Sequence, residues 1–224
     1  MPKERLDAAT LVTEISNMLK QIDSGDVTAL DTVSRRADPF KVLIATILSH
    51  RTRDKATIVA SENLFRVYSS AKELSEADIS EIEALIKPVG FYRVKAKRIK
   101  EVSKIIYEKY GGVVPDDFNT LLSLPSVGRK TANCVLVYGF GRPAIPVDTH
   151  VHRISNRLGL VSTKTPYETE EALKKVIDVK FWLDINDLLV RFGQKICKPI
   201  KPKCDFCTFK RFCRFYQSMQ KQIA

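Results

Sequence analysis

The stretch that decides the fold is LPSVGRKTAN, residues 124–133, in which a tight turn separates two helix-forming runs. The apolar run FNTLLSLP (118–125) ends at a proline, and a second helix is expected to begin near Arg129. Such a turn leaves backbone N–H groups unpaired beside a positive helix end, which together can bind a phosphate. We therefore predict a helix-hairpin-helix at about 117–139, a motif that holds a DNA backbone without reading bases. The alternative is a plain helix–helix turn.

Lys130 falls on the first turn of that second helix, where the helix dipole disfavours a cation. Partial desolvation also disfavours the ammonium form, so both effects favour the neutral amine. Because a neutral lysine is a nucleophile, we predict that Lys130 can attack carbon. The alternative is a lysine that contacts phosphate and does nothing more.

The bulk composition indicates an intracellular protein that binds a polyanion. The 224 residues suit one large domain or two modest ones, and no apolar run approaches the roughly 20 residues that cross a bilayer. The start of the chain, MPKERLDAAT, lacks the apolar core of a signal peptide. The net charge of +11 favours nucleic acid as the partner, and the alternative is a charge chosen for solubility.

Helical periodicity runs through most of the chain. Asp38 and Pro39 have the pattern of an N-cap followed by a first helical proline, Gly111 and Gly112 can end a helix, and TPYE (165–168) has capping-box spacing. The apolar stripes are Phe40, Leu43, Ile44, Ile47 and Leu48; Ala96, Ile99, Ser103, Ile106 and Tyr110; Leu173, Val176 and Ile177; and Ile185, Leu188, Leu189 and Phe192. No hairpin dipeptide lies between alternating apolar residues, so we predict an all-α fold.

The cysteines divide into one isolated residue and one group of four. Cys134 lies inside a helical pattern, where buried packing is expected. Cys197, Cys204, Cys207 and Cys213 are separated by six, two and five residues, which predicts metal ligation. Two paired knuckles would suggest zinc. Here the outer cysteines are far apart around one CxxC, a spacing that fits a cubane iron–sulfur cluster at least as well.

Asp148, in IPVDTHVHRISNRLGL (145–160), precedes a stripe of Val151, Ile154 and Leu158. This position predicts a helix N-cap. Most aspartates in such a position are caps and have no other role.

These three motifs, in this order, resemble the endonuclease III family of the helix-hairpin-helix DNA glycosylase superfamily. The resemblance extends from about Asp38 to Cys213. It implies an all-α fold of two domains: a six-helix barrel at 32–142, and a discontinuous helical domain at 1–31 and 143–224. The second domain would carry a [4Fe-4S] cluster on the loop 197–213, with the four cysteines as its ligands.

The resemblance also implies a bifunctional DNA glycosylase and apurinic/apyrimidinic lyase of base excision repair that acts on oxidised or damaged pyrimidines flipped out of double-stranded DNA. Lys130 matches the catalytic lysine that attacks C1′, expels the base and leaves a Schiff base, after which β-elimination cleaves the strand on the 3′ side. Asp148 matches the aspartate that assists it and stabilises positive charge on the sugar. A monomer in the cytoplasm, associated with the nucleoid, is expected.

The implied DNA contacts include three departures from the family pattern. Ser126 stands where the hairpin often has glycine, Arg51 where glutamine usually fills the gap left by the flipped base, and Phe91 where a leucine wedge is usual. Because Arg51 has donors for guanine O6 and N7, we expect a preference for lesions or mismatched pyrimidines opposite guanine. The alternatives are that Arg51 contacts phosphate and that Phe91 packs inside.

The residues assigned to DNA are Leu124, Ser126, Gly128, Arg129, Arg51, Phe91, Lys198, Lys201 and Lys203, and those assigned to the base pocket are Ser49, Asp54 and His150. Two other functions stay open: a mismatch-specific thymine or uracil glycosylase acting opposite guanine, and a non-catalytic DNA-binding module whose cysteines hold zinc. Adenine-mismatch relatives lack the lysine, so Lys130 disfavours that assignment.

Overall fold

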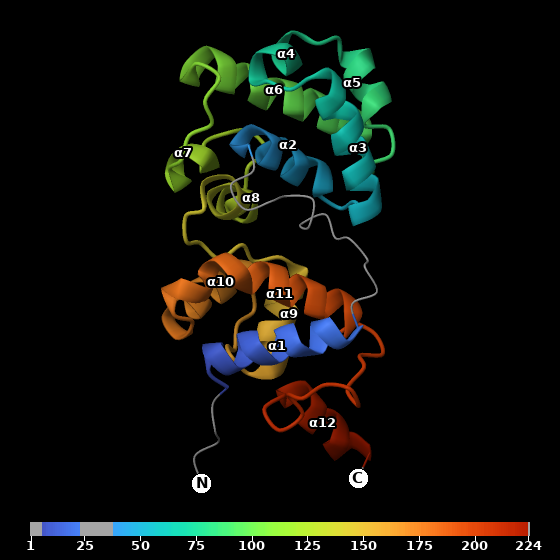
Figure 1. Ribbon diagram of the computed structural model, residues 1–224, viewed down its shortest axis with the longest axis vertical. Coiled ribbons are helices and arrows are strands. Elements are labelled where there is room, and N and C mark those ends of the chain that lie inside the picture. Colours follow the sequence, from blue (N-terminus) through green and yellow to red (C-terminus); the bar gives the residue numbers. More distant parts are fainter. Residues whose placement is uncertain (1–5, 23–37, 224) are drawn as a thin grey trace. The chain divides into compact units, whose positions relative to one another are not determined.

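The computed structural model describes residues 6–22 and 38–223, and every regular element in those ranges is a helix (Figure 1). The all-α prediction is confirmed. The helices are α1 (Ala8–Ile22), α2 (Pro39–Ser49), α3 (Asp54–Val67), α4 (Ala71–Glu76), α5 (Ile79–Leu85), α6 (Tyr92–Tyr110), α7 (Phe118–Leu122), α8 (Arg129–Cys134), the π-helix η1 (Val135–Gly139), α9 (Thr149–Leu158), α10 (Pro166–Val176), the 3₁₀-helix η2 (Val179–Phe181), α11 (Trp182–Lys195) and α12 (Arg214–Ile223).

The described residues form two compact units. One unit contains 38–144, and the other contains 6–22 together with 145–223. The domain assignment from the sequence, 32–142 against 1–31 and 143–224, stays a prediction. Its first boundary, between residues 31 and 32, lies outside the described residues.

In the unit 38–144, α6 packs against α2, α4 and α5. The start of α2 is as predicted: Pro39 is its first residue, and Asp38 Oδ1 accepts from the Phe40 N–H at 2.8 Å. The predicted stripe of α2 is buried. Helix α6 ends before Gly111 and Gly112, whose φ angles of 61° and 86° favour glycine, as predicted.

The hairpin also has the predicted elements. Helix α7 ends at Leu122, a turn follows, and α8 begins at Arg129. The chain continues directly into η1, where a Cβ on Gly139 would lie 3.0 Å from Pro39 Cα. Glycine therefore permits the close approach of η1 to α2. Cys134 is buried between α8 and η1, as the packing interpretation predicts.

In the unit of 6–22 and 145–223, α11 packs against α1 and α9. The stripe predicted for α11 is buried except at Leu188, which is half-buried. At the start of α10, Thr165 Oγ1 accepts from the Glu168 N–H at 3.2 Å, as the capping pattern predicts. The reciprocal bond differs, because Glu168 Oε2 accepts from the Lys164 N–H at 2.9 Å, one residue before the cap.

Candidate nucleic-acid interface and catalytic residues

The turn of the hairpin leads directly into the first turn of α8. Ser126 has a φ of 65°, and the Val127 N–H donates to Leu124 O at 3.2 Å to close the turn. The Ala132 N–H donates to Gly128 O at 2.9 Å, so the N–H groups before it on the first turn of α8 have no helical acceptor. A Cβ built on Gly128 would meet nothing within 4 Å. The turn therefore leaves open space at the start of α8, the kind of position where an anion can bind.

Lys130 is the second residue of α8 and is half-buried. Its neighbour Thr131 is buried, and Thr131 Oγ1 lies 3.0 Å from Nε2 of His50 at the end of α2. Burial, together with the positive charges of Lys130, Lys95 and Arg98, lowers the pKa of His50 from 6.5 to about 4. The imidazole beside α8 is therefore neutral at neutral pH.

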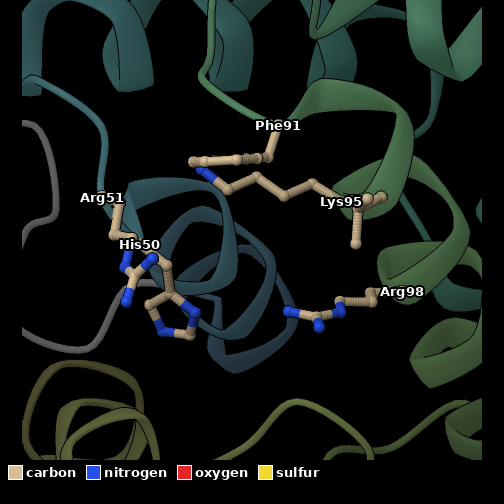
Figure 2. Close-up of a pocket in the computed structure, with 6 residues that line it drawn as sticks. His50, Arg51, Phe91, Lys95 and Arg98 are labelled. Carbon is tan, nitrogen blue, oxygen red and sulfur yellow. The ribbon is translucent and has the colours of Figure 1, made fainter.

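His50 also lines a basic pocket of about 470 Å³ at the junction of α2 and α6. Figure 2 shows Phe91 and Lys95 extending from one side toward Arg51 and His50 on the other. The lining residues are His50, Arg51, Phe91, Val94, Lys95 and Arg98, and none of them is acidic. A cationic pocket with an exposed aromatic ring is suited to nucleic acid.

Arg51 and Phe91 face this pocket from strained backbone. Arg51 has a φ of 52°, and Phe91, which precedes α6, has a φ of 58°. The Phe91 side chain is 65% exposed, so the alternative in which it packs inside is wrong. The pocket thus brings together the two residues that depart from the family's glutamine and leucine.

Left-handed backbone at non-glycine residues is confined to predicted DNA contacts. Among the described residues, those with positive φ other than glycine are Arg51, Phe91, Ser126 and Lys201. This conformation costs about 1 kcal/mol or more per residue, and it persists where the surroundings impose it. All four belong to the set that the resemblance assigns to DNA, although the sequence pattern contains no sign of the strain.

Asp148 is the N-cap of α9, as predicted: its Oδ1 accepts from the Val151 N–H at 2.8 Å. His150, on the first turn of α9, lies with Nδ1 3.1 Å from Nη2 of Arg153. Ser49 Oγ donates to a backbone carbonyl of its own helix, and Asp54 is the first residue of α3. Neither Ser49 nor Asp54 lines the basic pocket, so their role at a base stays a prediction.

The four cysteines of the C-terminal segment line one small cavity of about 20 Å³, together with Phe192 and Phe215. No disulfide joins them. Burial raises the pKa of the Cys207 thiol to about 11, and it also raises that of Cys213. A bound cation would reverse this preference, because metal ligation requires thiolates.

In the residues that the structure describes, no three or more His, Cys, Asp or Glu form a group that could hold a metal ion. The four thiols nevertheless surround a common cavity. Four thiols around one cavity are a donor set that zinc or an iron–sulfur cluster can use.

Two arginines of α9 anchor the start of the cysteine loop, a feature that the sequence analysis missed. Arg157 donates to Lys198 O at 2.8 Å and to Pro199 O at 2.9 Å, and it stacks over Phe215 at 3.9 Å. Arg153 Nη2 donates to Cys197 O at 3.0 Å. Arginine stripes on a helix resemble any solvated charged face, so only the structure reveals this role.

The basic loop beyond this anchor exposes its lysines, as a DNA-contacting loop would require. Lys198, Lys201 and Lys203 are all exposed, and Lys201 has a φ of 51°.

Among the described helices, none has both the length and the apolar character needed to span a membrane.

A family model for the HhH-GPD superfamily of base excision DNA repair proteins matches residues 44–178. The chain is 56% identical over 187 residues to the endonuclease III of Thermotoga maritima, which covers 84% of this chain and 88% of that one. It is 38% identical over 187 residues to the endonuclease III of Bacillus subtilis, covering 83% and 85%. The chain belongs to the endonuclease III family.

Solved structures agree with this membership. A trapped endonuclease III–DNA covalent intermediate has a TM-score of 0.82 and 32% identity, covering 96% of this chain and 99% of that one. A thermostable thymine-DNA glycosylase has a TM-score of 0.81 and 29% identity, covering 95% and 100%. The resemblance stated from three motifs is thereby confirmed, as is the helix-hairpin-helix glycosylase fold.

As an endonuclease III, the chain is a DNA glycosylase and apurinic/apyrimidinic lyase of base excision repair. The enzyme class that the resemblance implied is confirmed. The mismatch glycosylase and the non-catalytic zinc module are not favoured by these relatives.

Proposed function

We propose that this endonuclease III excises damaged pyrimidines from double-stranded DNA with Lys130 as the nucleophile. The observation that carries the proposal is the position of Lys130: it is half-buried on the first turn of α8, directly after the hairpin turn. A phosphate bound at that turn would hold the strand beside the amine.

In the proposed reaction, the Nζ lone pair of Lys130 forms a bond to C1′ while the C1′–base bond breaks and the base leaves with the bonding electrons. The sugar opens to a Schiff base, and loss of a C2′ proton expels the 3′ phosphate by β-elimination. Before attack, the amine must lose one proton, which Asp148 is proposed to accept. The relative solved as a trapped covalent intermediate with DNA supports a mechanism of this kind.

Asp148 is suited to this role because capping orients its carboxylate. Oδ1 is held by the Val151 N–H at 2.8 Å, and Oδ2 is left to take a proton or to balance positive charge on the sugar. The same bond fixes the start of α9, so one residue serves both structure and chemistry.

The cofactor that we propose is a [4Fe-4S] cluster held by Cys197, Cys204, Cys207 and Cys213. Support comes from four free cysteines around one cavity, with a sequence spacing that fits a cubane cluster. When bound, the cluster supplies iron–thiolate bonds that hold together a segment with little regular structure. The exposed lysines of the same loop then bind the DNA backbone with salt-sensitive affinity.

Arg51 and Phe91 are proposed to enter the duplex where the damaged base has left it. The exposed ring of Phe91 can part a base step, and the Arg51 guanidinium can donate to guanine O6 and N7. We therefore propose a preference for damaged or mismatched pyrimidines opposite guanine. The enzyme would act as a monomer on DNA at the nucleoid.

The nucleophile is tested by borohydride trapping on DNA that contains thymine glycol or an abasic site. Wild type is expected to form a covalent adduct, and Lys130→Gln is expected to form none while it still binds the duplex. Lys97→Gln is the control, because it removes one exposed charge from the same unit and keeps the amine of Lys130. Undiminished trapping by Lys130→Gln would assign the chemistry to another residue.

The cofactor is tested on the purified protein by colour and by elemental analysis. Brown protein with iron and acid-labile sulfide is expected, and Cys204→Ser should lose both. Colourless protein with stoichiometric zinc would overturn the assignment.

A further inference from the structure

Lys95 is a buried lysine that the chemistry above does not use. Its side chain is only 4% exposed, and burial lowers its pKa to about 8. Nζ donates to Leu48 O at 2.6 Å and to Thr52 Oγ1 at 2.7 Å, and both acceptors are neutral oxygens. Since burying an amine without a carboxylate is costly, its position calls for a reason other than core packing.

The contacts of Lys95 join two segments that are distant in sequence. Leu48 O is one of the last carbonyls of α2, where a cation is favourable, and Thr52 directly follows Arg51. The backbone N–H of Lys95 donates to Phe91 O at 3.0 Å, which starts α6. One residue is therefore bonded to the turn that carries Arg51 and to the residue that supplies the exposed ring.

Arg51 and Phe91 both have left-handed backbone, which is unfavourable for residues with a side chain. Such conformations persist only where neighbouring contacts over-determine them. The two segments also lie against each other, because a Cβ on Gly90 would be 3.5 Å from Arg51 O and 3.8 Å from Thr52 Oγ1. Lys95 supplies side-chain hydrogen bonds at this junction.

We propose that Lys95 is a positioning residue that holds Arg51 and Phe91 in the geometry they need to read the base opposite the lesion. It acts through the turn after α2 and does not touch DNA. Two of its three N–H donors are directed at Leu48 O and Thr52 Oγ1, and the contacts to a ligand in the pocket are proposed to come from Arg51 and Arg98. The proposal rests on the DNA roles assigned above to Arg51 and Phe91.

The test compares Lys95→Met with Lys97→Met on duplexes that carry one lesion opposite each of the four bases. Methionine keeps the length of the side chain and removes its donors, and Lys97 is an exposed lysine of the same helix. Lys95→Met is expected to reduce the ratio of cleavage rates between the best and worst opposite base by about tenfold. Lys97→Met should leave that ratio unchanged, and both variants should still be trapped by borohydride.

Thr52→Val provides a second, milder variant in case Lys95→Met does not fold. It removes the hydroxyl that accepts from Nζ and that also donates to His50 O at 3.3 Å, and it should shift the same ratio in the same direction by a smaller factor. Equal loss of cleavage opposite all four bases, with a lower Tm, would mean that Lys95 only stabilises the fold. A fall of about 1 in the salt slope of DNA binding would mean that Lys95 contacts phosphate. Either outcome overturns the proposal.

Arg51→Gln and Phe91→Ala are measured in the same panel. If they change the ranking of opposite bases and Lys95→Met does not, the positioning role alone is wrong. If neither changes the ranking, the DNA roles of Arg51 and Phe91 fail, and the inference about Lys95 fails with them. Loss of trapping is separate from both, because it concerns Lys130.

Discussion

The hairpin turn and the basic pocket belong to the same unit of the chain, yet they are built differently. The turn at 124–130 is one continuous segment whose donors are backbone N–H groups. The pocket is assembled from the turn after α2 and the start of α6, about forty residues apart, and its donors are side chains. A site built from backbone can hold any strand, whereas a site built from side chains can distinguish bases.

The first prediction tests whether the turn contributes affinity without selectivity. Gly128→Val should weaken binding to an abasic-site duplex by about 3 kcal/mol, or roughly 100-fold, because a branched side chain would fill the open space before the N–H groups. The φ of −94° suits valine, so the fold should be kept. Fluorescence anisotropy with each of the four opposite bases should show the same factor each time, and a base-dependent factor would contradict the comparison.

The second prediction concerns His50, which connects the two regions through Thr131. Its folded pKa of about 4 lies below the value of 6.5 for an exposed histidine, so between these values the unfolded chain binds more protons. Stability is therefore fully present above pH 6.5 and falls as the pH decreases toward 4, by about 2 kcal/mol after allowance for partial exposure. Urea denaturation at pH 7 and pH 4.5 should show this loss for wild type.

His50→Gln is the matched variant for that measurement. Its amide can still reach Thr131 but does not titrate, so the difference in stability between the two pH values should be smaller by the same amount. An equal pH dependence in wild type and variant would contradict the assignment to His50.

The third prediction tests whether the pocket distinguishes the base opposite the lesion through Arg51. Arg51→Gln should remove a preference for guanine opposite the lesion by about tenfold, or 1.4 kcal/mol, because one amide cannot match both acceptors on guanine as the guanidinium does. Single-turnover cleavage of lesions opposite all four bases measures it. An unchanged ranking would mean that Arg51 contacts phosphate.

The fourth and smallest effect concerns strain in the turn. Ser126→Gly should raise the free energy of unfolding by about 0.5 kcal/mol, because relief of the left-handed φ outweighs the extra entropy of glycine in the unfolded chain. Urea denaturation measures it. Gly111→Ser is the reverse control, since Gly111 has a φ of 61° and open space around it, and it should lower stability.

The same contrast decides what the sequence could predict. Residue spacing and turn chemistry identified the hairpin, the Asp148 cap and the cysteine loop, because each is formed by residues that are close together in sequence. Local pattern did not predict the partner of one capping side chain. The capping box predicts a bond from the Thr165 N–H to Glu168, but Glu168 accepts from the Lys164 N–H.

Tertiary contacts were beyond the reach of local pattern. In the sequence, Lys95 is one more basic residue on a helix that is rich in lysine and arginine, and no spacing distinguishes it from Lys97. Its burial depends on the turn after α2, which lies about forty residues earlier in the chain. His50 and the anchoring pair Arg153 and Arg157 were missed for the same reason.

Engineering of thermal stability would act on the four left-handed residues, which are Arg51, Phe91, Ser126 and Lys201. At each of these positions, stability favours a residue that tolerates a positive φ, whereas the proposed DNA contact requires the side chain that is present. A laboratory selection for survival at high temperature alone would drift toward glycine or asparagine at these four sites. A selection for repaired genomes would retain the side chains.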